Sequence, residues 1–417
     1  MDGVLTRGQA TAVAAVRSMI VAGAPHAVLF TGPGSVGKTT LALDLAAGLL
    51  CDAPIAADRP CRACRACRRV ASGNHPDLHR LAPGGAGNQI KIGATVGDPR
   101  PGVRELIDEL SLMPMEGGAR VAVVEGAHRM NEDAQNALLK TLEEPPVGVV
   151  IVLCADDEER LLPTIRSRCQ RIRLGTLGGR EIEIWLTDRG LADAPTAARA
   201  ARLADGRPGL ALAYVRAPEA LAARAELDRT LLDMLAARPS ERLAAMAGLL
   251  GRARDLAAAL AASGEPGDDV AATTRGPSGT RGRRPGARGT VAAAAVLVPQ
   301  AAAGSSDEAV PDADNAEPPA EDGRPVRSPA TERRRGALTL IEVWRRLAID
   351  LARTERGESG GVHDPALLEE VAAAAARLGA GSSAAFLVRL DEVGRAIDGN
   401  ASPELAMDVL ALAWPAA

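Results

Sequence analysis

The segment Gly-Pro-Gly-Ser-Val-Gly-Lys-Thr at residues 32–39 limits what this chain can fold into more than any other stretch. It follows a short apolar run, residues 26–31, and opens residues 39–50, whose apolar positions have helical spacing. A glycine-rich turn between a strand and a helix directs backbone N–H groups at phosphate oxygens. The lysine and the hydroxyl residue that close the motif can reach the terminal phosphates and a magnesium ion. A plain glycine-rich turn is the alternative, and the flanking strand and helix argue against it.

We therefore expect ATP or ADP to bind at this loop together with Mg²⁺. The candidate binding residues are Gly32, Gly34, Val36, Gly37, Lys38, Thr39, Thr40 and Glu125. Glu125 follows an apolar run, where a carboxylate can hold the metal directly or through water. The next residue, Gly126, has no side chain to orient a water molecule, although His128 or Glu132 could substitute. Nucleotide binding is therefore better supported than hydrolysis.

Two further apolar runs, residues 121–124 and 149–153, are separated by a helical stretch at 131–142 that stops before Pro145. Alternating buried strands and helices predict a parallel sheet covered on both faces. From residue 176 onward the strand signals disappear, and Ala-, Leu- and Arg-rich segments predict helices only. A chain of 417 residues is long enough for two or three domains. We expect an N-terminal α/β domain followed by a helical region.

Four of the six cysteines lie in one short stretch after the first helix of this α/β domain: Cys51, Cys61, Cys64 and Cys67. They offer four thiolates within one loop, a set that suits tetrahedral Zn²⁺ and leaves no coordination position open. In a reducing compartment, clustered cysteines bind metal more often than they form disulfides. We expect a structural zinc module at residues 51–67, with unbound reduced thiols as the alternative.

Residues 263–336 interrupt the helical region with a Gly-, Pro-, Ser-, Arg- and Asp-rich segment, and this composition predicts a disordered insertion. An Arg-rich part at 275–288 and an acidic part at 307–322 leave a nucleic-acid tail or a fold-back contact as alternatives. The net charge of −4 gives no basic field for holding DNA alone. The sequence has no membrane-length apolar run and no signal-peptide pattern, so we expect a cytoplasmic protein without a membrane segment.

Two runs identify a resemblance: Asn-Ala-Leu-Leu-Lys-Thr-Leu-Glu-Glu-Pro-Pro at residues 136–146, and Thr-Ile-Arg-Ser-Arg-Cys at 164–169. Both are highly similar to the signature of clamp-loader subunits. The chain resembles the delta-prime subunits of the bacterial DNA polymerase III clamp loader, within the AAA+ superfamily. The likeness is densest over residues 1–175. The insertion has no counterpart in that family.

The resemblance implies an α/β P-loop AAA+ domain with a parallel sheet, a small helical lid and an all-α collar that oligomerises. The expected bounds are residues 1–175 for the AAA+ domain with the zinc module, 176–216 for the lid, and 217–262 with 337–417 for the collar.

In that family the arginine of the Ser-Arg-Cys run reaches the nucleotide site of a neighbouring subunit. The resemblance therefore implies that Arg168 acts in trans as an arginine finger. Active subunits also carry a polar sensor after the strand equivalent to 149–153 and an arginine in the second domain. Here the first position falls at Cys154-Ala155-Asp156, and Gly209 stands where the arginine aligns. Both departures weaken hydrolysis and favour the stationary, delta-prime type.

The resemblance further implies a hetero-oligomer with motor subunits of the gamma or tau type and a delta-type subunit, which loads the sliding clamp on primed DNA. The chain would belong to a DNA-directed DNA polymerase holoenzyme without being the polymerase, and its own ATPase should be weak or absent. Two alternatives remain open. One is an ATP-hydrolysing motor subunit of the same loader, and the other is a zinc-containing nucleic-acid-binding protein that uses the basic insertion.

Overall fold

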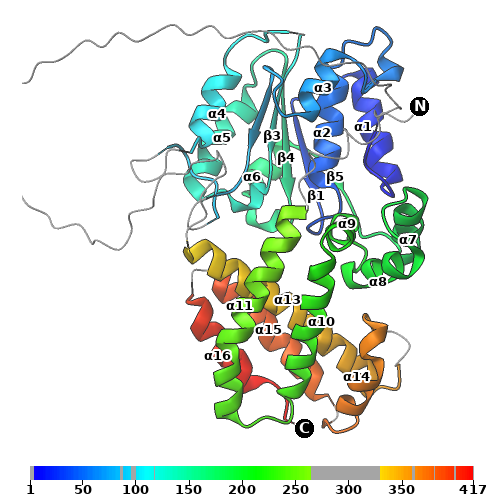
Figure 1. Cartoon of the computed structure of the whole chain (residues 1–417). Coiled ribbons are helices and arrows are strands. Elements are labelled where there is room, and N and C mark those ends of the chain that lie inside the picture. Colours follow the sequence, from blue (N-terminus) through cyan, green and yellow to red (C-terminus); the bar gives the residue numbers. More distant parts are fainter. Residues whose placement is uncertain are drawn as a thin grey trace, which may run out of the picture. The chain divides into compact units, whose positions relative to one another are not determined.

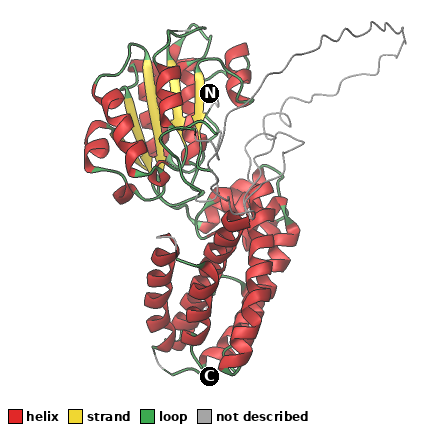
Figure 2. Cartoon of the chain, turned by 90° about the vertical axis from the view of Figure 1, so that its left-hand side faces the viewer, coloured by secondary structure: helices red, strands yellow, loops and turns green. Residues whose placement is uncertain are grey.

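The computed structural model describes residues 4–84, 88–94, 100–116, 118–263, 329–358, 362–379, 381–398 and 401–416. Within these residues, strands occur only up to Arg173, and every regular element after it is a helix (Figure 2). The predicted change from an α/β domain to a helical region is therefore confirmed. The same residues contain no helix long and apolar enough to cross a membrane.

Five parallel strands form the sheet of the N-terminal domain, in the order β2-β3-β4-β1-β5. They are β1 (Ala27–Thr31), β2 (Leu78–Leu81), β3 (Arg120–Val124), β4 (Val149–Ala155) and β5 (Gln170–Arg173). The central strands β1, β3 and β4 are buried along their whole length, which explains their continuous apolar sequences. The edge strand β5 buries only Ile172, so its sequence carries no apolar run.

Helices cover both faces of this sheet (Figure 1). They are α1 (Ala10–Ala22), α2 (Lys38–Leu49), α3 (Arg65–Ala71), α4 (Val103–Leu110), α5 (Glu132–Glu143) and α6 (Pro163–Arg168). Alternate residues of a strand point to opposite faces. Val28 and Phe30 accordingly join the cluster that contains α1 and α2, whereas Ala27 and Leu29 join the cluster that contains α4 and α5.

The start of α5 shows how the sequence sets a helix boundary. The Asn131 side chain accepts a hydrogen bond from the backbone N–H of Ala134 at 3.0 Å, which is an N-cap contact. Glu132 and Asp133 occupy the first turn, where the helix dipole favours negative charge. The helix therefore begins and ends within one residue of its predicted bounds, 131–142.

The remaining helices bury one large cluster of their own. They are α7 (Gly179–Asp188), α8 (Ala194–Ala204), α9 (Pro208–Arg216), α10 (Pro218–Asp233), α11 (Pro239–Ser263), α13 (Pro329–Glu355), α14 (Leu368–Ala375), α15 (Ser382–Asp398) and α16 (Pro403–Ala413). Trp344, Phe386 and Trp414 pack against one another in tilted and edge-to-face contacts within this cluster, with ring centroids 4.6–5.5 Å apart. The Trp414 indole N–H donates to the Leu231 carbonyl at 2.9 Å, so its one polar group is satisfied.

The helices α11 and α13 flank the segment for which the sequence predicts an insertion, and they pack against each other. The helix α13 begins at Pro329, earlier than the expected resumption at residue 337. Proline suits the first helical turn because its missing N–H needs no partner there, and Glu332 complements the dipole. The rest of the predicted insertion, residues 264–328, lies outside the described residues.

Candidate functional site

The loop between β1 and α2 has a backbone that only glycine can adopt at two positions. Gly32 has φ +136°, and a Cβ added there would lie 2.0 Å from the Leu174 carbonyl oxygen. Gly37 has φ +101° and is the N-cap of α2, which Lys38 begins. These two glycines let the chain turn sharply and direct the first N–H groups of α2 towards the loop. The loop therefore has the local structure that its motif predicts.

The ammonium group of Lys38 is enclosed by polar partners. It donates to the carbonyl oxygens of Gly32 and Pro33 at 2.7 and 2.5 Å. It also forms an ion pair with Asp156, with 2.7 Å between Nζ and Oδ1. Only 6% of the Lys38 side chain is exposed. A phosphate that binds at this loop must therefore compete with the Asp156 carboxylate for the lysine.

Asp156 follows the carboxyl end of β4, which pairs with β1 so that Ala155 lies opposite Thr31. The carboxyl ends of neighbouring parallel strands meet at one edge of a sheet, which brings Asp156 to the loop. Its backbone N–H donates to Nδ1 of His128 at 3.1 Å. Burial lowers the pKa of His128, while the Asp156 charge acts in the opposite direction. The neutral ring can therefore accept this hydrogen bond, and His128 holds Asp156 in place.

Glu125, the predicted metal ligand, is engaged by an arginine of the neighbouring strand. Its Oε1 accepts from Nη2 and Nε of Arg80 at 2.6 and 3.0 Å. Gly126 has φ +58°, and a Cβ added there would lie 2.9 Å from Cγ of Pro83. A carboxylate side chain at residue 126 would need both a strained backbone and a shift of this proline. Glycine therefore suits the local backbone at residue 126, where hydrolysis would require a side chain that orients water.

The other loop residues line the start of α2. Val36 is buried in the core, 1% exposed, and Gly34 would place a Cβ 3.4 Å from Oδ2 of Asp156. Thr39 interacts with the thiol of Cys154, whose pKa is raised first by burial and then by the charge of Glu125. Thr40 is half-buried in the first turn of α2. The predicted binding residues of the loop thus gather at the start of α2, whereas Glu125 pairs with Arg80.

Gly209, aligned with the sensor arginine, lies against the loop through its backbone. Its N–H donates to the Ser35 carbonyl at 2.9 Å, and an added Cβ would lie 3.0 Å from the same oxygen. Arg207 turns away, because its Nη2 donates to Glu342 of α13 at 3.0 Å. Neither residue offers a cation to the loop.

Arg168 ends the helix α6, and its guanidinium is held by two contacts. It donates to Oε1 of Glu143 at 2.5 Å and to the Thr164 carbonyl at 2.9 Å. A third of the side chain remains exposed, 34%. The Thr164–Cys169 run and the Glu143-Glu144 pair of the signature therefore meet in space. This contact brings together two runs that are separate in the sequence.

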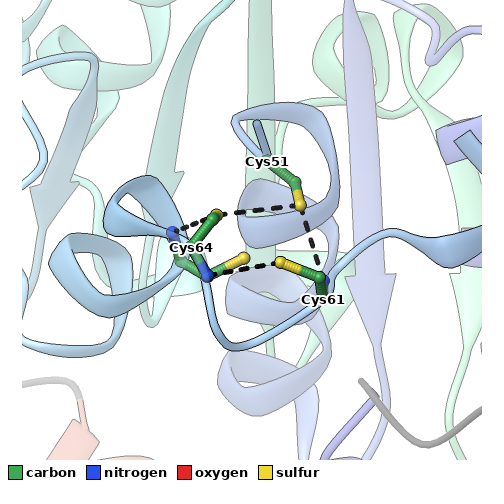
Figure 3. A group of neighbouring side chains, drawn as sticks. Cys51, Cys61 and Cys64 are labelled. Atoms are coloured by element: carbon green, nitrogen blue, oxygen red, sulfur yellow. Dashed lines mark hydrogen bonds between the residues drawn. The ribbon is translucent and has the colours of Figure 1, made fainter. Parts of the chain in front are cut away.

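The four cysteines of residues 51–67 gather in one cluster, in which all four sulfurs lie within 4.8 Å of one another. Figure 3 shows three of them, Cys51, Cys61 and Cys64, close together. The sulfurs of Cys51 and Cys64 are 3.9 Å apart. Tetrahedral zinc with Zn–S bonds of about 2.3 Å requires sulfurs about 3.8 Å apart. Backbone N–H groups of Cys61, Cys64 and Cys67 donate to sulfurs of the cluster at 3.3–3.4 Å, which stabilises thiolates. The cluster is compatible with a tetrahedral metal ion.

Asp44, a buried carboxylate in α2, joins this cluster to the loop, and the sequence analysis did not identify it. It pairs with Arg62, which follows Cys61 of the cluster. It also accepts hydrogen bonds from the Thr6 backbone and hydroxyl at 3.0 and 2.8 Å. A Cβ added at Gly37 would lie 3.7 Å from the Thr6 methyl group. A single acidic residue inside an apolar helix is the signal that could have revealed this link.

A five-stranded parallel sheet with this loop after β1 places the N-terminal domain in the class of P-loop domains. Within that class, residues 8–178 match the sequence model of the family described as DNA polymerase III, delta subunit. The delta-prime subunit of DNA polymerase III from Pseudomonas aeruginosa is 40% identical over 173 residues, covering 42% of this chain and 50% of that protein. The N-terminal domain is therefore a relative of delta-prime subunits, as its signature runs predict.

Two further relatives match this chain over a similar number of residues. The delta-prime subunit from Escherichia coli is 36% identical over 188 residues, covering 45% of this chain and 54% of that protein. The tau subunit from Escherichia coli is 35% identical over 186 residues, covering 43% of this chain and 27% of that protein. The chain thus spans about half the length of the curated delta-prime relatives it matches.

Proposed function

We propose that this chain is a delta-prime-type subunit of a DNA polymerase III clamp loader. In this role it assembles with motor subunits of the tau or gamma type and a delta-type subunit, and it helps load the sliding clamp on primed DNA. The relatives named delta-prime and tau support this choice of partners. A cytoplasmic location follows from a role in replication.

One observation carries the choice of a non-motor subunit. The site has an intact phosphate-binding loop but lacks hydrolytic groups at the three positions that motor subunits use. Gly126 replaces a carboxylate, and a side chain there would need a strained backbone and a shift of Pro83. In the region of the polar sensor, Cys154-Ala155-Asp156, the Asp156 carboxylate forms an ion pair with Lys38. Gly209 replaces the sensor arginine and contacts Ser35 through its backbone.

The proposed catalytic contribution of the chain lies at Arg168 rather than at its own loop. An arginine finger stabilises charge on the terminal phosphate of a neighbour and requires firm placement. The contacts of Arg168 with Glu143 and Thr164 hold the guanidinium at the end of α6, partly exposed. We propose that Arg168 exchanges Glu143 for the nucleotide of an adjacent motor subunit.

Two cofactors follow from the residues present. Zn²⁺ would be held by Cys51, Cys61, Cys64 and Cys67. With four thiolate ligands it would have a structural role, because no coordination position is left for water. ATP or ADP would bind at residues 32–40, and Mg²⁺ would be held by Thr39 with Glu125, once Arg80 shares or releases that carboxylate.

The isolated chain is expected to bind nucleotide without hydrolysing it. Lys38→Ala should weaken nucleotide binding about 10- to 100-fold, since a hydrogen bond to a charged group contributes about 1.5–3 kcal/mol. Lys140→Ala removes the same charge from an exposed position on α5 and should change nothing. Equilibrium binding and steady-state ATPase assays on the purified chain test this. Brisk turnover that Lys38→Ala abolishes would instead identify a motor subunit.

A further inference from the structure

The carboxylate of Asp156 lies where a phosphate-binding loop normally presents positive potential. It contacts the Lys38 ammonium at 2.7 Å, and its other oxygen would be 3.4 Å from a Cβ at Gly34. It therefore lies over the loop, between the first glycines and the lysine. Nearly half of its side chain is exposed, 47%, so an incoming ligand can reach it.

The surrounding structure holds the backbone of Asp156 in position. The N–H of Asp156 is bound by the buried His128, and the preceding residue Ala155 is in register with Thr31 of β1. Two other described acidic groups of this region have their own cations: Glu125 pairs with Arg80, and Asp44 pairs with Arg62. Asp156 is therefore the acidic group of this site that acts directly on Lys38.

We propose that Asp156 is a specificity-determining residue, which makes this site select a nucleoside diphosphate over a nucleoside triphosphate. The inference rests on the proposed nucleotide site. The lysine of such a loop bridges the β- and γ-phosphates. A fixed carboxylate at the same ammonium repels the added charge of a γ-phosphate more than it repels the β-phosphate. The loop amides at the start of α2 still favour the phosphates that both ligands share.

The selection has a consequence for the assembled complex. A subunit that holds a diphosphate keeps its loop and its lid contact at Gly209 in one state through each cycle. Such a subunit can present Arg168 from a constant position. Selection of a diphosphate by Asp156 would thus explain why a chain that does not hydrolyse ATP keeps an intact phosphate-binding loop.

The test is equilibrium binding of ADP and ATP to the full chain, with Mg²⁺ and with EDTA. The unchanged chain is expected to bind ADP about tenfold more tightly than ATP, equivalent to about 1.4 kcal/mol. Asp156→Asn keeps the shape of the side chain and should bring the two affinities close together, mainly by tightening ATP. Asp157→Asn removes the same charge one residue along, where the carboxylate caps a turn through the Glu159 N–H, and should leave the ratio unchanged.

Three other results decide against the proposal. Equal ADP and ATP affinities that Asp156→Asn leaves equal would show that Asp156 does not discriminate. A loss of ATP affinity in Asp156→Asn that occurs with Mg²⁺ and vanishes in EDTA would make Asp156 a metal ligand. Both results leave nucleotide binding itself intact. Absence of binding of either nucleotide to either chain would overturn the proposed nucleotide site together with this inference.

Discussion

Replacing Arg168 by alanine is expected to lower ATP turnover at the adjacent motor subunit about 10³-fold, the lower end of what an arginine finger contributes. The physical reason is the loss of a planar cation that meets the charge developing on the terminal phosphate. Lysine at residue 168 should restore little, because it lacks the planar, forked donor geometry. The measurement is single-turnover ATP hydrolysis in a loader reconstituted with motor and delta-type subunits on primed DNA.

Arg166→Ala is the matched control for this experiment. Arg166 lies in the same helix, α6, and pairs with Glu159 instead of Glu143. It should leave hydrolysis unchanged, and both variants should assemble and keep nucleotide at the loop of this chain. If a loader with Arg168→Ala hydrolyses ATP at every motor site as fast as a loader with Arg166→Ala, Arg168 is not an arginine finger. Its contact with Glu143 then has only a structural role.

The second large effect is expected at the cysteine cluster. Cys67→Ser should remove the metal and disorder the module around α3, since structural zinc contributes about 10–16 kcal/mol to small four-ligand modules at neutral pH. Burial raises the pKa of the Cys67 thiol, so a cation is needed to hold it as thiolate. Zinc content and hydrogen exchange of residues 51–71 report the change. The sheet should survive, because α3 adds only Val70 to the described core, and most of the other core residues belong to the strands and to α1, α2, α4 and α5.

Cys169→Ser provides the comparison, because Cys169 is buried outside the cluster, at the C-cap of α6. It should retain one zinc per chain. Full retention of metal in Cys67→Ser would show that the cluster is not a zinc site.

The sequence predicted the parts of the fold whose residues must be apolar. The strands β1, β3 and β4 are central, so their sequences are continuous apolar runs. The edge strands β2 and β5 are only partly buried, and their mixed sequences, Leu-His-Arg-Leu and Gln-Arg-Ile-Arg, carry no such signal. The phosphate-binding loop was predictable because its glycines are required by the backbone itself.

The partners of the site residues were not predictable in the same way. Lys38 and Asp156 are more than a hundred residues apart, and only the pairing of β1 with β4 brings them together. The contact of Arg168 with Glu143 depends on how α5 and α6 pack, and no periodic pattern in the sequence predicts that packing. Sequence indicated the residue types that bind nucleotide, whereas the folded chain decides which charges they meet.

Clamp loading is the measurement that tests the central claim most directly. Sliding clamp, primed DNA, ATP and the motor and delta-type subunits of the same organism are combined with and without this chain, and clamp retained on DNA is counted. We predict that loading requires this chain and continues with Lys38→Ala in it, because its own nucleotide is not turned over. Loading at an equal rate without the chain, or its loss with Lys38→Ala while the complex still assembles, would contradict the account.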